Sequence, residues 1–294
     1  MLDDLESGAE ISKHVDRLLR KADAYGRFPT PVDDIVAAAG LQQADDYVFD
    51  DSFVSQAPAA IRSIVRGVRD RIMGLVDRRA RVIHISPNIE HDGKRRFIKL
   101  HETVHEILPY QQSLLFADDN ETLSSGTKRL FEKEANQGAA EFLFQGTGFA
   151  KDASDLEISI PAIWGLATRY GSSFHAAVRR YAETHDGAVA AIVLECTPRS
   201  NDPPTWARQE CLTSRSWITQ FGPARWPILM DAITYPFLTS LTIPSLDQVP
   251  LADVNGSTVE TRVETYQTPY SSFVLLWVPQ RRRLLPRRKT IMET

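Results

Sequence analysis

A helix that carries two histidines on one face is the sequence feature that most restricts how this chain folds. Apolar residues recur at steps of three and four between Lys94 and Leu108, and Pro109 follows them, which predicts a helix that ends there. His101 and His105 stand four positions apart within it, one helical turn along. We therefore expect both imidazoles to point to the same side of the helix.

The full motif is H-E-x-x-H, from His101 to His105. Two imidazoles on one helix face can share one zinc ion, and Glu102 can hold the water that the metal activates and take its proton. The motif also fits two histidines that face a core, with Glu102 in solvent. A catalytic zinc ion takes three protein ligands and keeps a fourth position open, so the first interpretation requires a third ligand.

A second helix, predicted from about 128 to 144, offers two carboxylates for that position. Glu132 shares a stripe with small and apolar residues, which predicts that this side packs against another helix. Glu134 falls on a polar stripe that we expect to meet water. The geometry favours Glu132 as the third ligand, with Asn136, one turn along, orienting a zinc-bound histidine. The two stripes are Glu132, Asn136, Ala139, Ala140 and Leu143, and Glu134, Gly138, Glu141 and Gln145.

The remaining segments predict a mixed α+β fold. Two helices are expected within 9–40 and another at 59–71. A helical hairpin is expected over 161–184, broken at 171–173. Strands are expected at 74–77, 81–86, 189–196, 238–243, 258–266 and 272–278, with a short linker between the second ligand helix and the hairpin.

Length and composition set wider limits. At roughly 150 residues per domain, 294 residues correspond to about two domains. A net charge of −4 argues against a wholesale nucleic-acid coat or a polybasic membrane binder. The apolar runs fall short of the roughly 18 residues that span a bilayer, and the first residues are acidic, so we expect a cytoplasmic protein without membrane contact. Two cysteines, Cys196 and Cys211, cannot form a disulfide framework.

Two separated motifs resemble the ImmA/IrrE family of zinc-dependent metallopeptidases. The first is the run from Arg96-Phe97 into the H-E-x-x-H helix, and the second is Glu132-Lys133-Glu134-Ala135-Asn136. The resemblance extends over about 94–145 closely and 10–195 loosely. It implies that His101, His105 and Glu132 bind Zn²⁺ and that Glu102 is the general base. The sequence departs from the family pattern at Gly138, where an aromatic residue is usual, and at Phe144-Gln145.

The resemblance also implies a role. Members of this family are regulators that cleave helix-turn-helix repressors in stress responses or in the excision of mobile elements. We expect three parts: a helix-rich, zincin-like metallopeptidase domain with a short β-sheet over 1–150, a hairpin over 151–187 that is similar to the helix-turn-helix-like region of this family, and a mixed α/β C-terminal domain over 188–294. The last part could sense a ligand or bind substrate.

Several alternatives remain open. The chain could be a non-catalytic regulator that binds a repressor or DNA, or a zinc hydrolase for a small molecule. Direct DNA binding is undecided, since Arg179 and Arg180 lie on a hairpin of a kind that more often packs than reads bases. Tyr110 and His175 could donate to a transition state, but we assign them no role. We expect the basic run 281–289 to be a solvated tail.

Overall fold

The computed structural model describes residues 6–44, 74–78, 80–111, 125–223, 226–240 and 246–279. The chain divides into two compact units, Met1–His185 and Asp186–Thr294. Within the described ranges, no helix combines the length and the apolar composition that crossing a bilayer requires. The architecture is mixed, with a helical first unit and a β-rich second unit, which confirms the predicted α+β class.

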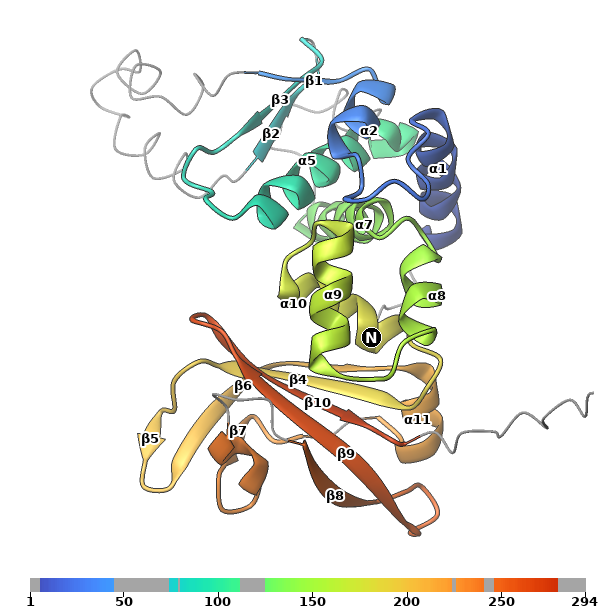
Figure 1. The fold of residues 1–294 in the computed structure, drawn as a ribbon. Helices are drawn as coiled ribbons and strands as arrows, with labels where there is room; N and C mark the ends of the chain where they lie inside the picture. The colour runs from blue at the N-terminus through green and yellow to red at the C-terminus, as the bar shows by residue number, and fades with distance from the viewer. Residues whose placement is uncertain are drawn as a thin grey trace, which may run out of the picture. The chain divides into compact units, whose positions relative to one another are not determined.

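The first unit contains helices and one short sheet (Figure 1). Strand β3 is the middle strand of this sheet, parallel to β1 and antiparallel to β2. The helices are α1 (Gly8–Lys21), α2 (Val32–Ala38), α5 (Asp92–Ile107), α7 (Ser125–Leu143), α8 (Gly148–Ser154), α9 (Ile160–Tyr170) and α10 (Phe174–Thr184). The strands are β1 (Gln42–Gln43), β2 (Gly74–Asp77) and β3 (Val82–Ile85).

Helix α5 lies at the centre of this unit. It packs against α7 and α2, and against β2 and β3 of the sheet, while α1 packs on α7 (Figure 1). Leu100 and Val104 of α5 are fully buried. Glu106, near the end of α5, pairs with Arg81 in the β2–β3 turn, and the Arg81 guanidinium also donates to the carbonyl of Ala39 after α2. These contacts hold the sheet and α2 against the central helix.

The predicted helical hairpin is present as α9 and α10, and its ends follow from local chemistry. Ser159 and Ser173 cap the two helices by accepting from backbone N–H groups three residues on. Pro161 occupies the first turn of α9, where its missing N–H costs nothing. Gly171 ends α9 with a left-handed backbone, φ 69°, which glycine adopts without strain.

A buried polar junction joins the loop before α2 to α5 and α7. The Thr30 side chain is fully buried and donates to the carbonyl of Leu143 at 2.7 Å. Gln145 donates to the same Thr30 hydroxyl at 3.2 Å and accepts from the backbone N–H of Gly26 at 2.8 Å. Arg96, on α5, donates to the Thr30 carbonyl. Arg96 and Gln145, both named in the family resemblance above, thus meet at one threonine.

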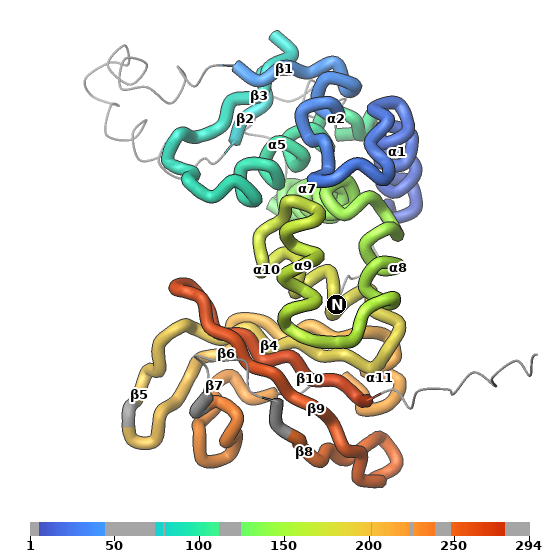
Figure 2. The backbone as a smooth tube through the Cα atoms, in the orientation of Figure 1, coloured from blue at the N-terminus to red at the C-terminus, as the bar shows by residue number. Residues whose placement is uncertain are grey.

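In the described part of the second unit, seven strands form an antiparallel sheet. Its order is β5-β6-β4-β10-β9-β8, with β7 paired to β6. Figure 2 traces β9 and β10 as one long hairpin, which their residue-by-residue pairing confirms. The elements are β4 (Val189–Glu195), β5 (Ser200–Asn201), β6 (Pro204–Thr213), α11 (Arg215–Phe221), β7 (Leu229–Asp231), the 3-10 helix η2 (Pro236–Ser240), β8 (Leu246–Ala252), β9 (Thr258–Gln267) and β10 (Ser271–Trp277).

One face of this sheet carries the core of the second unit. Alternate residues of β4 and β10, such as Ile192 and Val274, pack with Trp206 of β6 and Trp217 of α11. The period-2 alternation places every second side chain of a strand on the same face. Cys196 and Cys211 are both free thiols and partly buried.

Most predicted elements are found, and the differences have physical causes. The expected linker after α7 contains α8, which the sequence analysis missed because the segment is only seven residues long. Residues 238–240 belong to η2 rather than to the predicted strand, so that prediction is wrong there. β6 was not predicted, and it begins at Pro204, a residue that is uncommon within strands. The predicted helix at 59–71 and the basic run at 281–289 lie outside the described residues.

The Thr30 junction predicts a stability effect. Thr30→Val keeps the shape but removes the hydroxyl, so the carbonyl of Leu143 and the amide of Gln145 each lose a buried partner. We expect the free energy of unfolding to fall by about 1–3 kcal/mol, measured by urea denaturation. Thr184→Val is the control, because its hydroxyl donates only to the carbonyl one turn back in its own helix. Equal losses in the two variants would contradict the prediction.

Candidate metal centre

The two histidines of α5 meet on one face of the helix. His91 caps the start of α5 by accepting from the N–H of Lys94, and the chain turns extended at Leu108, ahead of Pro109. The Nε2 atoms of His101 and His105 lie 3.2 Å apart. Their side chains are 15% and 11% exposed, so both rings are largely shielded from water.

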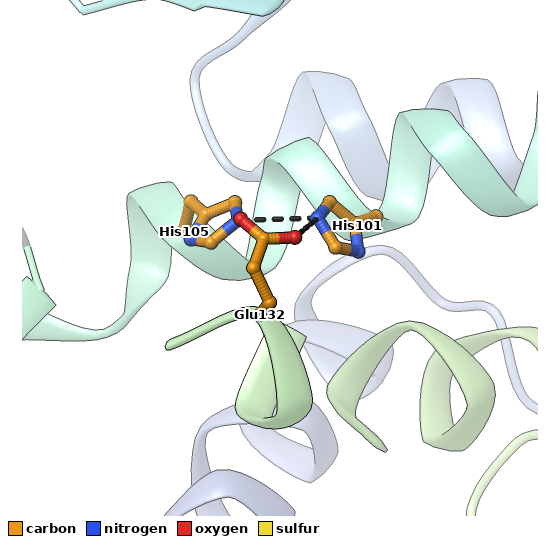
Figure 3. Close-up of side chains that lie close together, drawn as sticks. All are labelled: His101, His105 and Glu132. Carbon is orange, nitrogen blue, oxygen red and sulfur yellow. Dashed lines mark hydrogen bonds and ion pairs between the residues drawn. The ribbon is translucent and has the colours of Figure 1, made fainter. Parts of the chain in front are cut away.

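Glu132 reaches the same point from α7. Its carboxylate oxygens lie 3.3 Å from the Nε2 atom of His101 and 3.6 Å from that of His105 (Figure 3). The three side chains each offer one ligand atom, and all of these atoms lie within 4.8 Å of one another. The structure thus brings together the three residues that the sequence analysis selected.

The donor set fits a zinc ion. Zinc takes imidazole and carboxylate ligands in tetrahedral geometry, and bonds of about 2.0–2.1 Å place two such ligands about 3.3 Å apart. The two Nε2 atoms, 3.2 Å apart, match that value, and the two oxygens of Glu132 lie 3.3 Å from His101 and 3.6 Å from His105. Glu132 differs from the histidines in that its side chain is 62% exposed, which leaves one side of the group open to solvent.

Each histidine makes a hydrogen bond through its other ring nitrogen. The Nδ1 atom of His101 lies 3.2 Å from Oδ1 of Asn136, as predicted from the helical spacing. The Nδ1 atom of His105 lies 2.7 Å from Oε1 of Gln111, a residue that the sequence analysis did not select. Such contacts at Nδ1 leave the Nε2 atoms directed at Glu132.

The charges of the group influence one another. Burial alone would lower the pKa of His101, but the hydrogen bond to Glu132 and the negative charges of Glu102 and Glu132 raise it overall. Burial and the positive charge of His101 lower the pKa of His105. The hydrogen bond from His101 lowers the pKa of Glu132 against the opposing effect of burial. The shifts at His105 and Glu132 favour the deprotonated forms that ligate metals.

Glu102 follows His101 and faces the sheet. Burial, offset in part by the positive charge of His101, raises the pKa of Glu102 to about 7, the range in which a carboxylate exchanges protons near neutrality. A Cβ atom added at Gly74, the first residue of β2, would lie 2.5 Å from Ile98 and 3.0 Å from Oε1 of Glu102. Gly74 therefore gives the Glu102 carboxylate its room.

The burial of Glu134 differs from what the sequence analysis predicted. The sequence analysis predicted a solvated charge, but Glu134 is only 2% exposed. It accepts from Ser7, just before α1, and from Gln111 at 2.7 Å. The polar stripe of α7 is buried because α1 packs on it. Tyr110 belongs to the same region, where burial and the negative charge of Glu134 raise the pKa of its hydroxyl.

Two arginines of the hairpin and two further histidines have other surroundings. The Arg180 guanidinium donates to the carbonyl of Gly146 at 2.7 Å, and burial lowers its pKa, so this side chain serves packing. Arg179 is exposed, and His175 is partly buried on α10. His84 is buried within β3. None of these side chains belongs to the three-residue group of His101, His105 and Glu132.

Comparison with known families matches residues 67–181 to the peptidase M78 family, described as the IrrE N-terminal-like domain. This match confirms the ImmA/IrrE resemblance over those residues, which lie within the first unit. A solved structure titled as a Mycobacterium tuberculosis transcriptional regulator is similar with a TM-score of 0.52 at 12% identity. That similarity covers 92% of this chain and 87% of the other, and it shows the fold alone. No curated protein matches the chain.

Gly138 sets the separation of the two ligand-bearing helices. A Cβ atom added there would lie 2.7 and 2.9 Å from the two methyl groups of Val104 and 3.3 Å from Ile11 of α1. These distances are too short for an ordinary contact, so only glycine allows α7 this close to α5. The departure from the family pattern at Gly138 thus has a structural role in this chain.

We expect Gly138→Ala to weaken metal binding, because it pushes the helix of Glu132 away from the histidines. Overpacking lowers the free energy of unfolding by about 1–3 kcal/mol. This loss equals or exceeds the gain of about 1 kcal/mol that the higher helix propensity of alanine provides. Metal affinity by competition titration and stability by thermal unfolding test this expectation. Adding Val104→Ala should restore affinity, since it removes the methyl groups in the way.

Gly165→Ala in α9 is the matched control, since an added Cβ there meets nothing within 4 Å. It should stabilise the protein by roughly 0.5–1 kcal/mol and leave metal affinity unchanged. If Gly138→Ala also stabilised the protein and left metal affinity unchanged, the close packing at Gly138 would not determine the geometry of the site.

Proposed function

We propose that this chain is a zinc-dependent metalloendopeptidase that cleaves a protein substrate. The observation that carries the proposal is the convergence of His101, His105 and Glu132 on one point, with ligand atoms within 4.8 Å of one another. Two ligands come from one helix and the third from another, and two imidazoles with one carboxylate form a donor set typical of catalytic zinc. The match to the peptidase M78 family supports the same class of reaction.

The chain's own residues would divide the work. His101, His105 and Glu132 would hold zinc, which when bound polarises a carbonyl oxygen and lowers the pKa of water. The Glu102 carboxylate would take a proton from the attacking water and pass it to the leaving amine. Burial raises the pKa of Glu102, which suits a group that must accept and release a proton within one cycle. Asn136 would orient His101 through Nδ1.

The proposed substrate is a helix-turn-helix repressor, and the proposed compartment is the cytoplasm. The support for this substrate is the ImmA/IrrE resemblance, and the family match over residues 67–181 is consistent with it. In the same proposal, residues 1–150 form the catalytic domain, 151–187 the hairpin, and 188–294 a domain that senses a ligand or binds substrate.

Two substitutions separate metal binding from catalysis. Glu102→Gln keeps the size of the side chain but removes its basicity, so we expect it to retain zinc and to lose about 10²–10⁴-fold in cleavage rate. Glu132→Gln removes an anionic ligand and should lower zinc content. Zinc is measured by elemental analysis, and cleavage by electrophoresis with a repressor encoded beside the gene.

Asp155→Asn is the control, because it removes an exposed carboxylate from the same unit. It should change neither zinc content nor cleavage. Cleavage by Glu102→Gln at the wild-type rate would remove the proposed base. A wild-type protein that binds the repressor or its operator DNA, with no zinc and no cleavage, would identify a non-catalytic regulator instead.

A further inference from the structure

A chain of buried hydrogen bonds runs from His105 away from the metal centre. The Nδ1 atom of His105 contacts Oε1 of Gln111 at 2.7 Å, and Nε2 of Gln111 contacts Glu134 at 2.7 Å. Ser7 donates to the other oxygen of Glu134. Gln111 is 0%, Glu134 2% and His105 8% exposed. The four residues come from four separate segments of the first unit, and burial shields these hydrogen bonds from competing water.

The direction of each bond follows from the chemistry of its members. The amide nitrogen of Gln111 donates to a carboxylate oxygen of Glu134, so the amide oxygen is the Gln111 atom on the other side. The amide oxygen then faces His105, and because that oxygen only accepts, the Nδ1 atom of His105 must carry the proton. The Nε2 atom of a neutral His105 is consequently left with a lone pair, and it faces His101 and Glu132.

His101 has a weaker arrangement of the same kind. Its Nδ1 atom lies 3.2 Å from Oδ1 of Asn136, a longer contact, and Asn136 is exposed. Water can compete for both groups there. The two histidines therefore differ: the orientation of His105 is tied to a buried carboxylate, whereas that of His101 depends on a surface amide.

We propose that Glu134, acting through Gln111, is a positioning residue that fixes His105 as the Nδ1–H tautomer with Nε2 ready to ligate. The functional consequence rests on the zinc site proposed above. Hydrogen-bond partners of ligating histidines typically contribute 10–100-fold to metal affinity. The series of hydrogen bonds also links the site to α1, because Ser7 precedes that helix.

Glu134→Gln tests the proposal, and Glu141→Gln is its matched control. Glu141 lies on the same face of α7, is 9% exposed and accepts from the amide of Gln137 at 3.0 Å, an amide that contacts no histidine among the described residues. Both substitutions remove a mostly buried carboxylate that accepts from a glutamine. A purely structural role for Glu134 would therefore give the two variants the same behaviour.

Two measurements distinguish the roles. Two-bond ¹H–¹⁵N spectra of the metal-free protein report which nitrogen of His105 carries the proton, and competition with a chromophoric chelator reports zinc affinity. We expect the Nδ1–H form in the wild type and in Glu141→Gln. In Glu134→Gln the amide of Gln111 is free to turn, so both tautomers should appear and zinc affinity should fall 10–100-fold. Wild-type behaviour of Glu134→Gln in both measurements overturns the proposal.

Exchanging the two side chains provides the rescue. In the double variant Gln111→Glu/Glu134→Gln, the carboxylate accepts directly from His105 and the amide donates to it from α7. We expect the Nδ1–H tautomer and most of the zinc affinity to return. The exchange retains one carboxylate and one amide, so it decides the question even where Glu134→Gln does not fold; an Nε2–H tautomer in the exchanged protein overturns the proposal.

The tautomer measurement needs no metal, so the two proposals can fail separately. A wild type without zinc affinity refutes the zinc site, while the response of the His105 proton to Glu134→Gln still decides the positioning role.

Discussion

The close contact between α5 and α7 at Gly138 is the constraint on which the candidate site depends. His101 and His105 belong to α5 and Glu132 to α7, so the distance between the helix axes decides whether the carboxylate reaches the imidazoles. That distance is set where the Gly138 backbone lies against Val104, one residue before His105. A side chain at Gly138 would separate the helices at the level of the ligands.

Partly buried polar contacts then hold α5 in place on its other sides. Glu106 pairs with Arg81, whose guanidinium also donates to the backbone after α2, and Arg96 donates to the carbonyl of Thr30. Each of these contacts joins segments far apart in the chain. Because a buried polar group is costly when it loses its partner, such contacts favour one arrangement of the helices over similar ones.

Residues of the candidate site could be predicted from the sequence wherever the spacing within one helix indicated them. The spacing of His101 and His105 is a property of one helix, and Asn136 follows Glu132 by one turn, so both pairs could be inferred from periodicity. Glu134 and Gln111 could not. The stripe of Glu134 appears solvated from its own residues alone, and its partner Ser7 is 127 positions away. Gln111 follows Pro109 beyond the predicted helix, where no periodicity indicates a direction.

The same reasoning explains the second unit. β4, β9 and β10 show runs or alternation that predict strands, whereas β6 begins at Pro204 and β8 contains Pro250. Proline is tolerated at the first residue of a strand and on an edge strand, and β8 is the last strand in the sheet order. These positions are defined by the assembled sheet and are not visible in the segment itself.

The division of the site between two helices connects its formation to folding. Helix α5 by itself supplies two imidazoles, and a pair of ligands holds a divalent cation only weakly. The third donor arrives only when α7 has docked, and the polar network around Glu134 requires α1 as well. Capture of an ion at this point would therefore stabilise the assembled domain over its partly folded forms, so that removal of the ion by a chelator would loosen the contacts among all three helices.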